Sequence, residues 1–146
     1  MSLIHDVKIT VVAAAAAAAQ TEVVSSVLDM QGWDGVMFVA LTGGVTTDAV
    51  LTLTAKGNTA NSTSSPTPVT QVATSAFTAD GTSADSKALV VDVNEPALRY
   101  VFASLTRTAA NAVVGGIIAI QYKAALKPTV QDATVIASAV GPGTAG

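Results

Sequence analysis

The sequence predicts an all-β protein, an antiparallel β-sandwich of jelly-roll type with extended N- and C-terminal arms. Short apolar segments recur about every ten to fifteen residues, with Gly, Asn, Asp, Ser or Pro between them, as in sandwiches and barrels. Several of these segments alternate apolar and polar side chains with the period of two that a strand requires. No amphipathic pattern of helical period is sustained long enough to predict a helix.

Length and composition limit the classes of function. A chain of 146 residues fits one domain. The absence of cysteine excludes disulfides and thiolate chemistry. A net charge of −3 offers no basic surface for nucleic acid, and no apolar run reaches the ~20 residues of a membrane span. Because only 12% of the residues are charged, we expect partners to cover part of the surface.

The chain divides into three parts by composition. Residues 1–20 hold an N-terminal strand and an Ala-rich segment. Residues 21–127 form the β-sandwich domain, with a long loop over residues 56–86 that is rich in turn-forming residues. Residues 128–146 form a tail of small residues after Pro128.

The first half of the chain predicts four strands. Residues 7–11 alternate, with Val7, Ile9 and Val11 on one face, and residues 22–28 form a second strand before the turn-like DMQGWDG. VMFVAL, over residues 36–41, is apolar on both faces, which predicts a central strand covered on both sides. In VLTLTA, over residues 50–55, Leu51, Leu53 and Ala55 share a face and the threonines are half-exposed.

The second half predicts further strands after the loop. One strand is expected near residues 69–72, inside the loop. KALVVDV follows at residues 87–93, with Leu89, Val91 and Val93 on one face, and NEP makes the next turn. RYVFASLTR, over residues 99–107, and GGIIAIQYK, over residues 115–123, complete the sandwich.

Catalytic residues are scarce, so we do not expect an enzyme or a cofactor. His5 is the only histidine and has no acid or nucleophile near it in the sequence. Two aspartate pairs, Asp29 with Asp34 and Asp80 with Asp85, flank turns, where aspartate usually binds the backbone. A loose calcium site is the alternative, without the spacing of an EF-hand.

Three other residues are candidates for binding. Trp33 lies in a turn flanked by glycines, as a lid over one end of the core or as an exposed anchor for a partner. Arg99 and Arg107 lie eight residues apart on one strand and so point to one side. They are either solvated strand ends or ion-pair partners of an acidic neighbouring subunit.

The run of alanines at residues 13–19 has three interpretations. A signal peptide would use Lys8, the apolar middle and Gln20, but His5 and Asp6 stand where positive charge is needed. A helix of seven residues is too short to be stable alone. We therefore expect an extended segment that packs closely on its own sheet or on a neighbouring subunit, with Ala16 at its centre.

Two segments resemble a known protein family. DMQGWDGVMFVALTG matches a D-x-x-G-[aromatic]-x-x-V-x-F pattern, and DVNEPALRYVFASLTR matches P-x-x-R-Y-V-x-A-x-L-T-R. These patterns are similar to those of the head decoration, or cement, proteins of tailed bacteriophages. The matching region extends over about residues 28–128, and the middle loop departs from the pattern in length and composition.

The resemblance implies a structural virion protein without catalytic activity. Such a protein binds the outside of the capsid, commonly as a trimer, and stabilises it by bridging major capsid subunits; it would be made in the host cytoplasm. The expected subunit or capsid contacts are Trp33, Arg99, Tyr100, Arg107 and Ala16. Two alternatives stay open: a tail or connector component of the virion, and a carbohydrate- or calcium-binding adhesion module.

Overall fold

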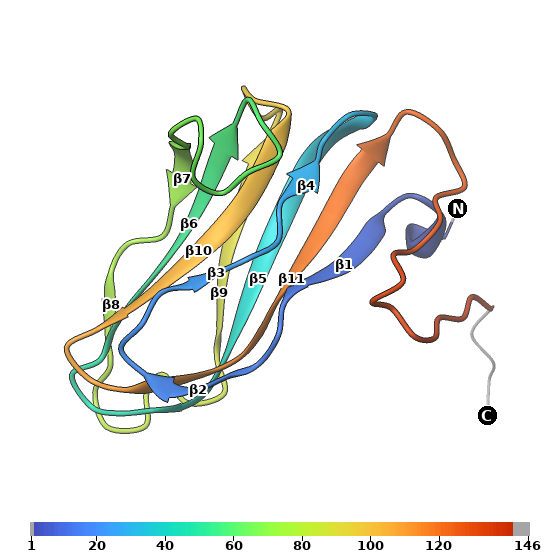
Figure 1. Cartoon of the computed structure of the whole chain (residues 1–146). Coiled ribbons are helices and arrows are strands. Elements are labelled where there is room, and N and C mark those ends of the chain that lie inside the picture. Colours follow the sequence, from blue (N-terminus) through green and yellow to red (C-terminus); the bar gives the residue numbers. More distant parts are fainter. Residues whose placement is uncertain (1, 142–146) are drawn as a thin grey trace.

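A computed structural model describes residues 2–141, which form two antiparallel sheets packed face to face (Figure 1). Sheet A has the strand order β1-β11-β5-β9, with β2 also paired to β11. Sheet B has the order β3-β10-β6-β7, with β4 paired to β10 and β8 paired to β6. The predicted antiparallel β-sandwich is confirmed. Most connections pass from one sheet to the other; the finer jelly-roll assignment, which rests on this strand order, stays a prediction.

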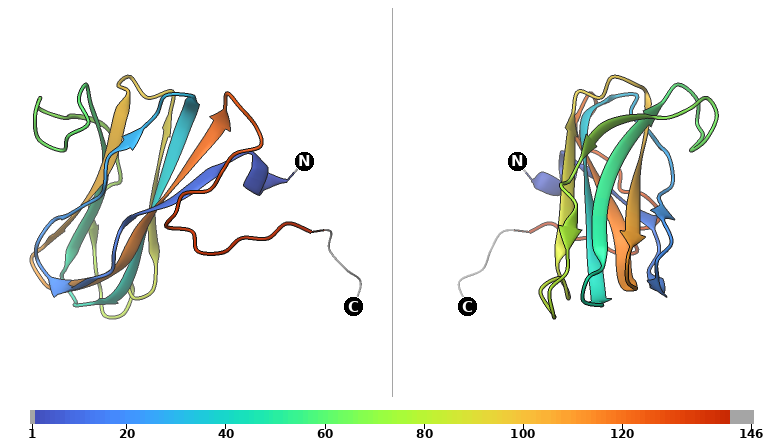
Figure 2. Two further views of the ribbon diagram at one scale, coloured as in Figure 1. Left: turned by 45° about the vertical axis from the view of Figure 1, so that its right-hand side comes forward. Right: turned by 90° about the vertical axis from the view of Figure 1, so that its left-hand side faces the viewer.

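The strands differ widely in length. Sheet A contains β1 (Lys8–Ala13), β2 (Ala16–Ala19), β5 (Trp33–Val45), β9 (Ala88–Asn94) and β11 (Ala112–Ala124). Sheet B contains β3 (Val23–Val24), β4 (Leu28–Asp29), β6 (Val50–Asn58), β7 (Val69–Ala73), β8 (Phe77–Thr78) and β10 (Tyr100–Thr108). A 3-10 turn, η1 (Leu3–His5), precedes β1. The short strands β2, β3 and β4 lead the chain from the edge of sheet A to the edge of sheet B (Figure 2).

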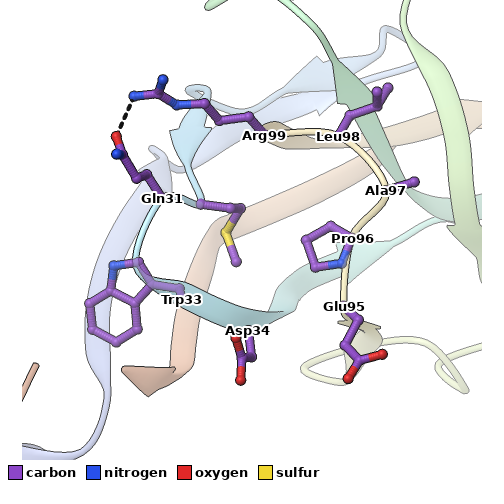
Figure 3. Close-up of a pocket in the computed structure, with 9 residues that line it drawn as sticks. Gln31, Trp33, Asp34, Glu95, Pro96, Ala97, Leu98 and Arg99 are labelled. Atoms are coloured by element: carbon purple, nitrogen blue, oxygen red, sulfur yellow. Dashed lines mark hydrogen bonds between the residues drawn. The ribbon is translucent and has the colours of Figure 1, made fainter. Parts of the chain in front are cut away.

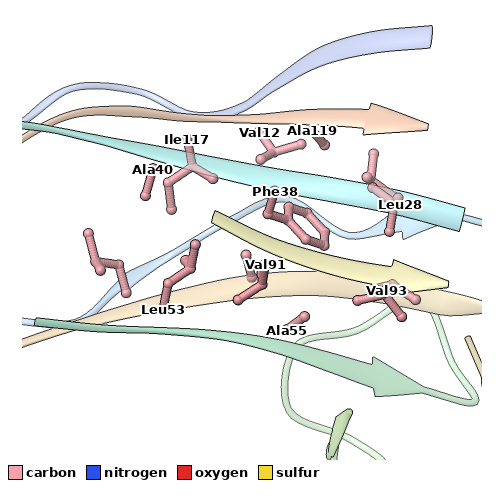
Figure 4. Close-up of a cluster of buried hydrophobic side chains, with 14 of the residues drawn as sticks. Val12, Leu28, Phe38, Ala40, Leu53, Ala55, Val91, Val93, Ile117 and Ala119 are labelled. Carbon is pink, nitrogen blue, oxygen red and sulfur yellow. The ribbon is translucent and has the colours of Figure 1, made fainter. Parts of the chain in front are cut away.

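The core lies between the sheets and consists of alternate side chains of the strands (Figure 4). Phe38 of β5 is fully buried at its centre, opposite Leu53 and Ala55 of β6. The predicted inward face of β6 is confirmed, because its leucines are buried while Thr52 and Thr54 are half-exposed. Burying this apolar area, at about 25 cal/mol per Å², is the main stabilising term of such a fold.

The predicted facing of the first strand is wrong. In β1 the buried side chains are Thr10 and Val12, whereas Val11 is 44% exposed. The register places Thr10 opposite Ala119 on the inner face, and Val12, two residues further on, enters the core. The period of two holds from Ile9 to Val12, but the apolar residues Ile9 and Val11 lie on the outer face, so polarity did not indicate which face is buried.

The predicted two-sided burial of residues 36–41 is also wrong. Strand β5 is central, as predicted, because it lies between β11 and β9. Its inner side chains are fully buried, but Met37 and Val39 are half-buried and Leu41 is 43% exposed. Sheet B covers only one face of sheet A, so the other face stays open to solvent in the described chain.

The remaining predictions hold with adjusted boundaries. Residues 22–28 contain two very short strands, β3 and β4, in place of one. Strand β7 confirms the predicted strand inside the long loop. In β9, Val91 and Val93 are buried and Val90 is exposed, as the alternation predicted. Strands β10 and β11 appear where RYVFASLTR and GGIIAIQYK predicted them.

The one-sided burial of β5 predicts a contrast between adjacent residues. Replacing Phe38 by alanine empties a closed site and should cost about 3–5 kcal/mol in the free energy of unfolding. Replacing Val39 by alanine removes half-exposed methyl groups and should cost less than half as much. Urea denaturation of both variants measures the difference, and equal losses would show that both faces are buried.

Candidate functional site

The five candidate residues lie at two opposite ends of the sandwich. Arg99 and Tyr100 lie where β10 begins, and Trp33 lies where β5 begins, at the same end. Arg107 lies near the other end of β10, and Ala16 belongs to β2 beside it. The structure therefore does not unite Arg99 and Arg107 in one site.

At the first end, Arg99 makes a two-pronged ion pair with Asp29. Its Nε and Nη2 donate to the two carboxylate oxygens of Asp29, each at 2.8 Å, and Nη2 also donates to Oε1 of Gln31 at 2.7 Å. The guanidinium lies 5.2 Å from the centre of the Tyr100 ring. Fixed geometry of this kind makes the pair stronger than a typical surface ion pair, although both side chains are exposed.

The ion pair changes the protonation equilibrium of both partners. The hydrogen bond from Arg99, followed by the backbone N–H of Gln31, lowers the pKa of Asp29 to about 2. The hydrogen bond with Asp29 in turn raises the pKa of Arg99. The carboxylate of Asp29 is thus engaged within the chain and is not free to bind a cation.

A cavity of about 430 Å³ lies beside this ion pair. Gln31 and Arg99 meet on one side of it, with Asp34 and Glu95 on the other (Figure 3). Trp33 lines the cavity and also packs, partly buried, against the core. Within residues 2–141, no three His, Asp or Glu side chains gather as ligands for a metal ion.

Asp85 and His5 do not line this cavity. Asp85 accepts a hydrogen bond from the N–H of Val45 at 2.8 Å, as predicted for an aspartate beside a turn. His5 lies exposed in η1. These positions bring no acid, base and nucleophile together.

Arg107 has an internal role in place of the expected contact with a neighbouring subunit. Its side chain is only 2% exposed. Its nitrogens donate to the carbonyl oxygens of Thr21 and Ala17 at 2.8 Å, to that of Ala112 at 2.6 Å, and to Oγ1 of Thr21 at 3.0 Å. The guanidinium therefore ties β2 and the residues just after it to the first residue of β11.

The alanine run packs on its own sheet. Strand β2 pairs with β11, and Ala16 lies opposite Val114 and packs against the main core. Gly116 has a positive φ of 134°, and a Cβ there would lie 3.1 Å from the carbonyl oxygen of Ala13. This close approach explains the glycine at 116, whereas most alanine side chains of the run are exposed and Ala16 is half-buried within its own chain.

The largest unassigned feature is the outer face of sheet A. Paired residues of β1, β11, β5 and β9 form two rows. The first row consists of Ile9, Ile120 and Met37, followed by Asp92, and the second, wholly apolar row consists of Val11, Ile118, Val39 and Val90. Val11 and Val90 are 44% and 47% exposed. Asp92 accepts a hydrogen bond from the hydroxyl of Tyr122 at 2.5 Å. Burial and this bond raise the pKa of Tyr122 to about 12.

The outer face of sheet B has the opposite character. Thr52, Thr54 and Lys56 of β6 point outward beside Thr106 of β10. The hydroxyl of Ser104 on the same face donates to Glu22. Phe102 pairs with Lys56 and Val24 pairs with Ser104, so this face also carries apolar side chains, but it lacks the continuous apolar rows of sheet A. Sequence reasoning missed the apolar face because VMFVAL was interpreted as buried on both sides.

Comparisons with known proteins add no assignment. Neither a scan against models of protein families nor a search of curated proteins finds a match to this chain. In the part of the chain that the structure describes, no helix is long and apolar enough to cross a membrane. Function must therefore be inferred from the apolar face of sheet A and from the end that carries Asp29 and Arg99.

The Asp29 ion pair predicts a shifted titration. The carboxylate should titrate near pH 2 in the folded protein, below its ordinary value of 3.8. Because the folded pKa is the lower one, the pair stabilises the fold above about pH 4 and loses this effect as the pH falls through about 2. Titration followed by NMR measures the pKa directly, and Arg99→Met should raise it towards 3.8. A pKa unchanged by this substitution would contradict the assigned cause.

The buried guanidinium predicts local loosening when it is removed. Arg107→Met leaves three carbonyl oxygens without their donor, each worth about 1–3 kcal/mol where water cannot replace it. Hydrogen exchange should therefore accelerate at residues 13–21, while the centres of β6 and β10 stay protected. Arg99→Met is the matched control and should leave residues 13–21 unchanged. Uniform exchange in both variants would refute the role of Arg107.

Proposed function

We propose that this protein is a structural component of a phage virion that binds the outside of the capsid, as a trimer, and bridges major capsid subunits. The observation that carries the proposal is the apolar outer face of sheet A, with Val11, Leu41 and Val90 each more than 40% exposed. A contiguous apolar face on a protein with few charges is typical of a surface that another protein covers. The described chain does not cover it.

The two segments that carry the resemblance to decoration proteins meet in the fold. The two resembling segments are about seventy residues apart in the sequence, yet Asp29 of the first forms the ion pair with Arg99 of the second. Trp33 and Pro96, which also belong to the two patterns, line one cavity beside that pair. Both patterns therefore describe a single structural unit at one end of the sandwich.

The two faces suit a protein that lies on a larger assembly. Sheet A would face the capsid and exclude water from its apolar rows, while the threonines of sheet B would face solvent. Each such contact is small, since four strands about 4.8 Å apart and about six residues long span only about 400 Å². Several copies bound together would hold neighbouring capsid subunits far more strongly than one copy alone.

One second candidate has a specific observation in its favour. The cavity at the first end combines Trp33 with the carboxylates of Asp34 and Glu95, a combination suited to a carbohydrate- or calcium-binding module. A glycan array and a calcium titration test it, because ligand binding would raise the melting temperature. A tail or connector component would instead form a six-fold ring.

Binding to capsids should depend on the apolar face. The wild-type protein should bind saturably and stoichiometrically to expanded capsids assembled without it. Leu41→Glu, on the outer face of sheet A, should lower the affinity at least about a hundredfold, since a charge would be buried against apolar groups. Thr54→Glu, on the outer face of sheet B, is the matched control and should bind normally. Absence of wild-type binding to any form of the capsid would contradict the proposal. Equal binding by both variants would show that sheet A is not the face that binds the capsid.

A further inference from the structure

The two edge strands of sheet A, β1 and β9, differ in whether another part of the chain binds their backbone. At the β1 edge, the N–H of Ile9 donates to Oε1 of Gln131 at 2.6 Å, and the N–H of Val11 donates to Oγ1 of Thr134 at 2.9 Å. At the opposite edge, β9 pairs with β5 and, within residues 2–141, with no second strand. About half of the N–H and C=O groups of such an edge strand point away from the sheet and can bind another strand.

The space beside β9 is apolar. A cavity of about 340 Å³ there is lined by Leu51, Phe77, Leu89 and Val90, among others. Phe77 is 44% exposed although it is aromatic. A strand added to β9 would direct alternate side chains towards this cavity and towards the apolar outer face of sheet A. Edges that combine free backbone groups with pockets for alternate side chains bind extended peptides by strand addition.

The C-terminal segment of the chain has the matching character. Residues 135–140 read VIASAV, a β-prone and mainly apolar stretch, yet they form no strand in the described structure. Ile136 is 99% exposed and Val140 is 53% exposed. The segment just before them is anchored, since Thr129 and Gln131 donate to the carbonyl oxygens of Ile4 and Val7.

We propose that residues 135–140 of one copy add as a strand to β9 of a second copy. The segment cannot serve its own β9, because Thr134 holds it at the β1 edge (Figure 1). Three strand spacings of about 4.8 Å separate the two edges, so crossing the sheet would use most of the roughly 20 Å that six extended residues span. No residues would remain to pair along β9.

The contact has a defined symmetry. The tail of one copy meets the edge of the next, so the interface joins two different surfaces and forms a closed ring or an open chain. A closed ring of three would supply the trimer of the proposed function. Because the contact joins copies of this chain, it can be tested without any capsid, and its failure is distinct from a failure to bind capsids.

Crosslinking tests the contact directly, since the natural chain contains no cysteine. A double variant, Ile136→Cys with Val90→Cys, is treated with a short bis-maleimide and separated on a denaturing gel. Covalent multimers as the main product are expected, with the largest band giving the ring size. The matched control pairs Ile136→Cys with Thr70→Cys on the exposed edge strand β7 of sheet B, and it should stay monomeric. Crosslinking only within one chain, or equally in both variants, would overturn the proposal.

Truncation gives a second, independent readout. Removing residues 135–146 keeps Thr129, Gln131 and Thr134, so the β1 edge stays bound and the melting temperature should change little. The mass in solution should fall from oligomer to monomer. Ile136→Asp in the full chain should have the same effect. An oligomer that persists in both variants would contradict strand addition by the tail.

Discussion

The sheets of this sandwich pack through one face each, and that constraint decides which apolar side chains the chain can bury. Strands β5 and β11 are apolar on both faces, so burying Phe38 and Ala119 leaves Val39 and Ile118 on the outside. Sheet B meets the same constraint with threonines on its outer face. The outer face of sheet A is therefore the more apolar of the two and is the one suited to another protein. The proposed capsid contact and the proposed strand addition both involve sheet A.

At each end of the sandwich, an arginine binds a segment that connects or flanks the strands. At one end the buried guanidinium of Arg107 binds three carbonyl oxygens and holds the crossing from sheet A to sheet B. The chain passes close to β11 just before β2, where a side chain at Gly116 would meet the backbone of Ala13. At the other end Arg99 binds Asp29 and joins two distant segments. The two arginines thus stabilise opposite ends of the same strand through different partners.

Much of the fold could be predicted from the period of two, which identified most strands and the inward leucines of β6. The facing of β1 could not, because the apolar side chains of Ile9 and Val11 lie on its outer face while Thr10 is buried. The exposure of Val39 could not be predicted either. The sequence shows only that the side chain is apolar, and this holds whether its own chain or a partner covers it. The spacing of Arg99 and Arg107 predicted that both point to one side of the strand. Their roles depend on distant partners, Asp29 and Ala17, which the period of the strand does not reveal. The hydrogen bonds from Gln131 to the backbone near β1 could not be predicted, because no sequence pattern links these distant residues.

The central claim is that a partner in the assembled particle covers the outer face of sheet A. Met37 reports on this face directly, since it is half-buried there, while Met30 lies in the core as an internal reference. The measurement is the rate of methionine oxidation by dilute peroxide, followed by mass spectrometry, in the free protein and in purified virus particles. The account predicts that Met37 oxidises much faster than Met30 in the free protein and as slowly as Met30 in the particle. Oxidation of Met37 at the same rate in both states would contradict it.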